Sequence, residues 1–248
     1  MFPILQIGGL AVQVPGLILL LGLWVGLSAA ERRSRLYGIP AETLYNLVFA
    51  CLVAGVTGAR LTYAGMHLDV FIRSPLGLFS LRPELLDPLG GLAAALLVAG
   101  IIIQRRSLRP GAVLDALTPL FAILLIAVPA ANYASGDAYG SLAALPWAVE
   151  LWGAERHPVQ IYELLAALGI FFYLGARPRL KEFEGQPAGG VFLNFLVLSA
   201  AARLFLEAFR GESPVIGPGL RIIQLIAWAV MAAGLVGLWL PDRTIRRG

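Results

Sequence analysis

The sequence has few charged side chains for its length. Of its 248 residues only 14% are charged, whereas 58% are hydrophobic, and the mean hydropathy is +0.79. Soluble domains contain about 25% charged residues, because polar groups must cover the surface that faces water. The composition therefore excludes a soluble enzyme and a disordered chain, and it predicts an integral membrane protein.

Cysteine and lysine are also scarce. Cys51 is the only cysteine, so the chain has no intrachain disulfide and no metal cluster built on cysteine. A retinal protein needs a lysine inside the membrane to attach its chromophore, but the only lysine, Lys181, falls in a predicted loop. A transporter is disfavoured because the sequence shows no repeated halves. We expect neither a metal ion nor a cofactor.

Long hydrophobic runs take up most of the chain. A helix needs about 20 mainly apolar residues to cross roughly 30 Å of hydrocarbon, whereas the strands of a membrane β-barrel are short and alternate in polarity. The runs are long and continuous, so they predict an all-α integral membrane protein that forms one polytopic domain over residues 1–248. Seven transmembrane helices are expected, near residues 12–30, 43–66, 88–104, 112–129, 158–176, 188–210 and 220–241.

Basic residues alternate in number from one predicted loop to the next. Short cytoplasmic loops are enriched in basic residues. The loops after the first, third and fifth helices and the C-terminal tail hold three each, whereas the other loops hold one or two. The basic-rich sets are Arg32, Arg33, Arg35; Arg105, Arg106, Arg109; Arg177, Arg179, Lys181; and Arg243, Arg246, Arg247. This pattern predicts an outside N-terminus and a cytoplasmic C-terminus, and the net charge of +4 needs no nucleic acid to explain it.

Five ionisable residues fall within or at the edge of predicted helices, namely Arg60, Glu163, Arg203, Glu207 and Arg210. In the predicted orientation all five lie in the outer half of the membrane, where ionisable groups are costly and suggest a function. Arginine is suited to phosphate because its planar fork can donate two parallel hydrogen bonds. The simpler alternative is that Arg203 and Glu207 neutralise each other across one helical turn while Arg210 reaches the interface. We favour a site for an anionic phospholipid.

Several motifs resemble those of the bacterial prolipoprotein diacylglyceryl transferases. Residues 156–163, Arg-His-Pro-Val-Gln-Ile-Tyr-Glu, resemble the Arg-His-Pro-x-Gln-x-Tyr-Glu block of that family. Further blocks follow in the family's order, namely Gly58-Ala59-Arg60-Leu61, then Asn132-Tyr133 with Asp137 and Gly140, Pro146-Trp147, and Arg203 with Glu207, Phe209, Arg210 and Gln224. The resemblance covers nearly the whole chain.

The resemblance implies a multi-pass enzyme of the bacterial cytoplasmic membrane, with its site on the outer side. Its substrates would be phosphatidylglycerol and a prolipoprotein signal peptide, whose lipobox cysteine receives the diacylglyceryl group. This reaction needs a base for the thiol and positive groups for the departing phosphate. The motifs suggest catalytic roles for His157, Asn132 and Arg203, and substrate-binding roles for Arg60, Asp137, Gln160, Glu163, Glu207 and Arg210. For His157 the alternative is a local hydrogen bond or cap before Pro158.

Four positions differ from the family's pattern. Leu89 and Pro129 stand where the family has a histidine and an arginine, and Pro15 and Ser199 stand where it has tyrosines. Leucine and proline can neither accept a proton nor bind phosphate, and general-base help is worth about 10²–10⁴-fold in rate. The alternative function is therefore a diverged, non-catalytic member of the same scaffold that binds a phospholipid or a lipoprotein.

Overall fold

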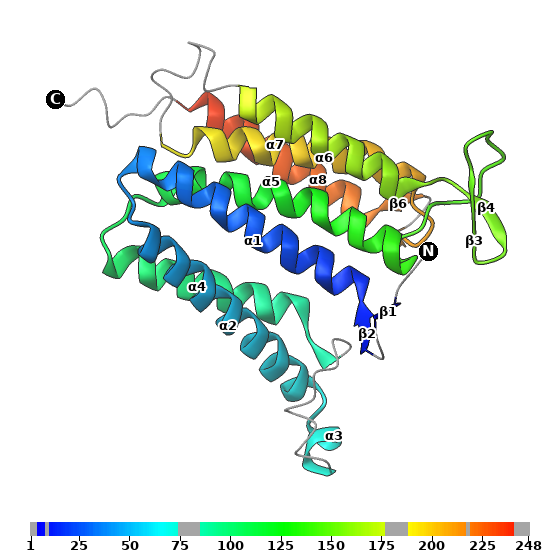
Figure 1. Ribbon diagram of the computed structural model, residues 1–248, viewed down its shortest axis with the longest axis horizontal. Coiled ribbons are helices and arrows are strands. Elements are labelled where there is room, and N and C mark those ends of the chain that lie inside the picture. Colours follow the sequence, from blue (N-terminus) through cyan, green and yellow to red (C-terminus); the bar gives the residue numbers. More distant parts are fainter. Residues whose placement is uncertain (1–3, 8–9, 74–84, 177–187, 217–218, 241–248) are drawn as a thin grey trace. The chain divides into compact units, whose positions relative to one another are not determined.

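The computed structural model describes residues 4–7, 10–73, 85–176, 188–216 and 219–240 (Figure 1). Over these ranges the chain is mainly helical, and its strands form three separate two-stranded hairpins. Six of the described helices are long and apolar enough to cross a membrane, and α6 is a further apolar helix. The prediction of an all-α multi-pass membrane protein is confirmed.

The apolar helices coincide with the seven predicted runs. They are α1 (Val14–Ser34), α2 (Ala41–Met66), α4 (Pro88–Arg105), α5 (Pro110–Ser135), α6 (Val159–Ala176), α7 (Gly190–Leu206) and α8 (Ile222–Trp239). Short helical pieces follow three of them, namely the 3₁₀ turn Arg35–Tyr37, helix α3 (Leu68–Arg73) and the 3₁₀ turn Glu207–Phe209. The sequence did not predict the hairpins β1–β2 (Ile4–Ile7, Leu10–Gln13), β3–β4 (Val149–Leu151, Ala154–Arg156) and β5–β6 (Val215–Ile216, Leu220–Arg221).

The described helices divide into two compact units. The first unit comprises Met1–Arg33 together with Gly111–Gly248, and the second unit is Ser34–Pro110. A single domain over residues 1–248 and the orientation of the chain in the membrane both stay predictions. Six of the basic residues that predict the orientation lie outside the described residues, namely Arg177, Arg179, Lys181, Arg243, Arg246 and Arg247.

Small residues bring α2 and α4 together in the second unit. A Cβ atom added at Gly58 would lie 2.3 Å from the Cβ of Ala94, and one added at Gly91 would lie 2.9 Å from the backbone oxygen of Gly55. In lipid, helices associate through close packing because their apolar side chains gain little by leaving hydrocarbon. The glycines therefore set the distance between these two helices.

In the first unit, α5 is the most buried of the candidate spans, with half of its most apolar 18-residue segment inside the protein. Helix α1 packs against it through Gly22 and Gly26, where an added Cβ would lie within 2.7 Å of Ala127 or Leu120. Helix α7 packs against both α6 and α8, and the β3–β4 hairpin extends from one end of this bundle (Figure 1). The buried residues at the centre of the apolar cluster are Ala122, Ile170, Leu174 and Phe195.

A buried carboxylate from α5 caps the start of α7. The two oxygens of Asp115 accept hydrogen bonds from the backbone amides of Gly189 and Phe192, both at 2.8 Å. The first amides of a helix have no partner within it, so a capping oxygen stabilises them. Gly189 has a φ of 103°, which other residues rarely adopt. Asp115 thus fixes where α7 begins relative to α5.

Candidate functional site

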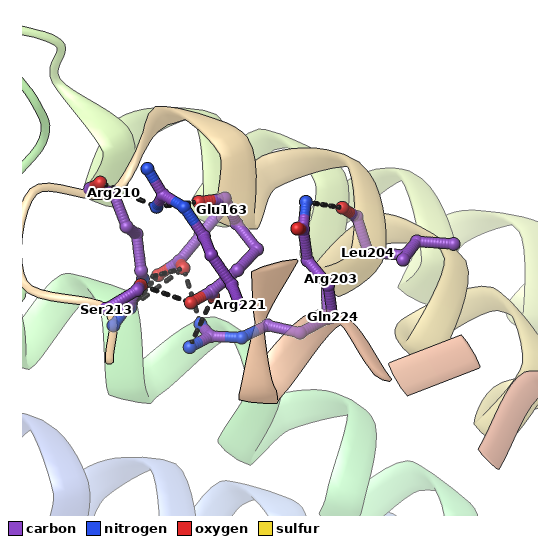
Figure 2. A network of polar contacts seen from close by, with 8 residues as sticks. Glu163, Arg203, Leu204, Arg210, Ser213, Arg221 and Gln224 are labelled. Atoms are coloured by element: carbon purple, nitrogen blue, oxygen red, sulfur yellow. Dashed lines mark hydrogen bonds and ion pairs between the residues drawn. The ribbon is translucent and has the colours of Figure 1, made fainter. Parts of the chain in front are cut away.

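Glu163, in the second turn of α6, lies at the centre of a network of charged side chains in the first unit (Figure 2). Arg203 on α7 donates from Nη1 to Oε1 of Glu163 at 2.9 Å. Arg210, just beyond α7, donates from Nε to Oε1 and from Nη2 to Oε2, both at 3.0 Å. One carboxylate therefore binds two guanidinium groups, and it binds that of Arg210 through two parallel hydrogen bonds.

Glu207 is the second carboxylate of the network, and its side chain is fully buried. Its Oε2 atom lies 2.9 Å from Nη2 of Arg203, and its Oε1 atom accepts a hydrogen bond from the hydroxyl of Ser213. Among the described residues Oε2 has no aligned hydrogen-bond donor, so its contact with Arg203 is an ion pair. A buried charge needs such a partner to offset the loss of hydration.

Arg221 fastens the start of α8 to the end of α7. Its Nη1 atom donates to the backbone oxygen of Arg210 at 2.7 Å and to that of Glu207. These carbonyls lie at the C-terminal end of α7 and its 3₁₀ turn, where a positive charge is favourable. Gln224 on α8 adds a hydrogen bond of 3.3 Å to the backbone oxygen of Leu204. The turn that bears Glu207 and Arg210 is thus held by its backbone.

A cavity of about 360 Å³ lies beside the network, between α5, α6 and α7. Its wall is mainly apolar, and its charged lining residues are Glu163, Arg203 and Arg210. A second cavity of about 290 Å³ is also lined by residues of α6 and α7, and it shares Ala166, Ile170 and Ala202 with the first. Binding sites commonly combine an apolar wall with a few placed polar groups. The cavity has a charged end and an otherwise apolar wall, and this combination suits an amphiphilic ligand.

Four of the five embedded charges meet in this network, namely Glu163, Arg203, Glu207 and Arg210. Arg60 belongs to the second unit, where its Nη1 atom donates to the backbone oxygen of Leu85 at 3.0 Å. That bond ties α2 to the residues before α4. A role for Arg60 at the head group stays a prediction.

Asn132 and Asp137 lie in the turn at the end of α5, and Gln160 on α6 is hydrogen-bonded to that turn. The amide of Gln160, which is buried, donates to the backbone oxygen of Asp137 at 2.8 Å. The backbone oxygen of Asn132 accepts from the amides of Gly136 and Asp137. None of the three is among the described residues that line the 360 Å³ cavity. Their predicted substrate contacts stay predictions.

His157 lies among aromatic rings between β4 and α6. Its ring centroid is 5.1 Å from that of Phe209 and 6.2 Å from that of Tyr162. Its backbone oxygen accepts from the amide of Val159 at 2.8 Å, a local bond of the kind expected before Pro158. Its Nδ1 atom is buried and has no hydrogen-bond partner among the described residues. The structure thus gives His157 a packing role, and its catalytic role stays a prediction.

Arg156 organises the loop beside the network. Its guanidinium carbon lies 4.5 Å from the ring centroid of Tyr139, and the side chain donates to the backbone oxygens of Gly140 and Leu151. A hydrogen bond to the carboxylate of Glu212 raises the pKa of the Tyr139 phenol above its ordinary value, because ionisation would place two negative charges together. The two hydrogen bonds and the ring contact of Arg156 thus support this loop.

Two of the positions that differ from the resemblance line the 360 Å³ cavity. Pro129 lies inside α5, and Ser199 lies on α7, where its hydroxyl donates to the backbone oxygen of Leu196. Leu89, in the second unit, is 76% exposed in the first turn of α4, and Pro15 is half-buried in α1. Among the described residues no group of three or more acidic, histidine or cysteine side chains could hold a metal ion.

Sequence reasoning missed two members of the network. Arg221 is the single basic residue of a predicted loop, and a single charge outside a hydrophobic run resembles any topology marker. Ser213 had no signal in the sequence. Arg221 reaches its partners only after α8 has packed against α7, whereas Ser213 reaches Glu207 through the turn that follows α7. A hydrogen bond to a backbone oxygen in another helix leaves no periodic pattern to recognise.

Comparisons with known proteins agree on one family. The family model described as Prolipoprotein diacylglyceryl transferase matches residues 3–240. A protein of Finegoldia magna named phosphatidylglycerol–prolipoprotein diacylglyceryl transferase is 27% identical over 232 residues, which cover 93% of this chain and 92% of the relative. Proteins of the same name from Clostridioides difficile and Gloeobacter violaceus are 24% and 26% identical, covering 92% and 98% of this chain and 90% and 94% of the relatives.

Proposed function

Because the chain belongs to the prolipoprotein diacylglyceryl transferase family, we propose that its charged network and cavity bind phosphatidylglycerol and present it to a lipobox cysteine. The family establishes a membrane transferase of lipoprotein biosynthesis. Our proposal concerns the substrates, the residues that contact them and the place of the reaction. We place the site on the outer side of the bacterial cytoplasmic membrane, in keeping with the predicted orientation.

The proposal rests mainly on the position of Arg203 and Arg210 at one wall of a largely apolar cavity. Together with Arg221 they give three positive charges, against two negative charges on Glu163 and Glu207, so one positive charge is left over. Phosphatidylglycerol has one negative charge, on its phosphodiester, and two apolar acyl chains. An arginine pair above an apolar wall complements both parts.

In the proposed reaction the sulfur of the lipobox thiolate attacks a glycerol carbon of the lipid. A carbon–sulfur bond forms while the carbon–oxygen bond to the phosphate breaks, and the electron pair leaves with glycerol phosphate. Arg203 and Arg210 donate hydrogen bonds to the phosphate oxygens as negative charge develops on the leaving group. The thioether product and glycerol phosphate then depart.

The proton of the thiol needs an acceptor, since only the thiolate is a good nucleophile. We assign this role to His157, whose Nδ1 atom has no partner among the described residues and whose ring packs against Phe209, next to Arg210. Asn132 and Arg60 are proposed to contact the head group, with Asp137 and Gln160 shaping the nearby loop. Each assignment follows the motif in which the residue occurs.

The test is a transfer assay with the purified protein in phosphatidylglycerol vesicles and a lipobox peptide, using the same peptide with serine in place of cysteine as the control. Arg203→Ala should lower the rate about 10²–10³-fold, the usual effect of removing one donor to a developing negative charge. Transfer by the Arg203→Ala variant at the wild-type rate would contradict the catalytic assignment.

A second candidate function is lipid or lipoprotein binding without catalysis. It is favoured by Pro129, which lines the cavity where the resemblance expects an arginine. Leu89→His combined with Pro129→Arg restores both expected groups. Transfer that appears only in this double variant would support the binding function, whereas transfer by the wild type would exclude it.

A further inference from the structure

The two carboxylates of the network have different surroundings. Glu163 lines the cavity and its side chain is 14% exposed, whereas Glu207 is 0% exposed and lies outside the cavity lining. Glu207 is held by Arg203, by Ser213 and, through its backbone, by Arg221. Glu163 is therefore the one of these two carboxylates that a molecule in the cavity can reach.

Glu163 presents two oxygens to the arginines much as a phosphodiester does. Arg210 binds both oxygens as a fork, and Arg203 binds one of them, with N–O distances of 2.9–3.0 Å. The two non-bridging oxygens of a phosphodiester accept the same fork. A lipid phosphate and the Glu163 carboxylate therefore need the same donors.

Both anions cannot occupy these donors at once. Two negative charges in contact with the same pair of guanidinium groups repel each other strongly, because little water is present to screen them. The arginines have other supports when Glu163 withdraws, because Arg203 keeps its ion pair with Glu207 and the backbone of Arg210 keeps its bond from Arg221. The geometry thus allows the carboxylate to leave while the arginines stay.

We propose that Glu163 is an exchangeable internal anion. It pairs with Arg203 and Arg210 in the empty site, gives way to the phosphate of an anionic lipid, and returns to the arginines to expel the phosphate-bearing product. The exchange of anions is a property of the charged network, but naming the lipid as phosphatidylglycerol and the product as glycerol phosphate rests on the proposed function.

The test uses Glu163→Gln in the full-length protein, because glutamine keeps the shape of the side chain and removes its charge. The dissociation constant for phosphatidylglycerol in nanodiscs should fall at least about tenfold, as expected when a neighbouring like charge is removed. Inhibition by added glycerol phosphate should strengthen by a similar factor. In the transfer assay KM and kcat should both fall, since the lipid binds more tightly and the product leaves more slowly.

Glu207→Gln is the matched control, because it removes the other carboxylate that pairs with Arg203. It should raise KM and weaken lipid binding, since it removes a support of Arg203 while the Glu163 carboxylate stays in the cavity wall. Unchanged or weaker binding in Glu163→Gln would overturn the inference and leave Glu163 as an ordinary support for the arginines. A diacylglycerol, which has the acyl chains but no phosphate, should bind equally well to the wild type and to Glu163→Gln, and equal tightening for it would overturn the inference too.

Glu163→Asp serves as a second variant if Glu163→Gln does not accumulate in the membrane. Its shorter side chain keeps the charge and weakens the internal pair, so phosphate affinity should rise less than in Glu163→Gln but still exceed that of the wild type. If Glu163→Gln binds more tightly and the wild type transfers no lipid, the exchange stands and the proposed function fails. If the wild type transfers lipid and neither variant binds more tightly, the exchange fails alone.

Discussion

The helix pairs α2–α4 and α6–α7 represent two ways of joining helices in a membrane. In the second unit, α2 and α4 approach through glycines whose hydrogens face the other helix, as at Gly58 and Gly91. In the first unit, the ends of α6 and α7 are joined by the ion pairs of Glu163 with Arg203 and Arg210. The first arrangement leaves no room for added atoms, whereas the second depends on charge.

The two helix pairs differ in purpose, because glycine contacts serve stability whereas a charged network can serve function. A glycine contact contributes dispersion and has no group free for chemistry. A network of guanidinium and carboxylate groups costs free energy to bury, and it is retained where charges serve a purpose. Substitutions in the two pairs should therefore produce different kinds of defect.

The largest effect on stability should follow from Glu207→Ala. It leaves Arg203 without its fully buried partner, and breaking a buried ion pair costs roughly 3–5 kcal/mol. The variant should unfold at a lower temperature in detergent, and its rate of lipid transfer, measured in parallel, should also be lower. Glu155→Ala, at an exposed position of β4, is the control and should leave both unchanged. A small effect of Glu207→Ala would mean that water reaches the network.

Gly58→Ala should destabilise the α2–α4 pair by about 1–3 kcal/mol, the usual cost of overpacking. The added methyl group would lie 2.3 Å from the Cβ of Ala94. Gly65→Ala is the matched control on the same helix, since nothing lies within 4 Å of its added Cβ, and there alanine should stabilise the helix. Equal effects of the two substitutions on unfolding would contradict the role of glycine packing.

Removing the cap of α7 should cost more than removing the cap of α4. Asp115→Ala leaves two backbone amides without their acceptor, for a loss of about 2 kcal/mol, whereas Asp87→Ala removes one bond, to Gly90, and should cost about 1 kcal/mol. Comparison of the two unfolding free energies tests this order. A larger loss of unfolding free energy in Asp87→Ala than in Asp115→Ala would contradict this order.

The smallest effect should come from Arg221→Lys. Lysine keeps the charge near the end of α7 but cannot place a nitrogen where the rigid guanidinium places Nη1, so we expect a loss of roughly 0.5–1.5 kcal/mol in stability. Arg221→Ala should cost more, because the carbonyls of Glu207 and Arg210 then lose this donor altogether. A lysine variant as unstable as the alanine variant would mean that the two hydrogen bonds of Nη1, and not the charge, hold the turn.

The helices could be predicted from the sequence and the hairpins could not. Hydrophobic runs such as residues 112–129 predicted spans that the structure confirms, because the partition of a segment into hydrocarbon depends on its own composition. Hairpin strands such as Val149–Leu151 are only three residues long, too short for an alternating pattern to stand out.

The candidate site was predicted in part. The sequence singled out Glu163, Arg203, Glu207 and Arg210 because charges inside hydrophobic runs are conspicuous, and the structure brings these four together. Arg221 has no distinguishing signal in the sequence, since its partners are backbone oxygens that no sequence motif reveals. Long-range contacts of this kind depend on how α7 and α8 pack.

The sequence by itself determined that this protein crosses the membrane as a set of helices and that several of its few charges lie inside them. Only the tertiary structure decided which of the two carboxylates faces the cavity. Hydropathy is a sum over neighbouring residues and is independent of how helices rotate against one another. The exposure of Glu163 and the burial of Glu207 depend on that rotation, because a helix turns its side chains toward a cavity or away from it only after it has packed.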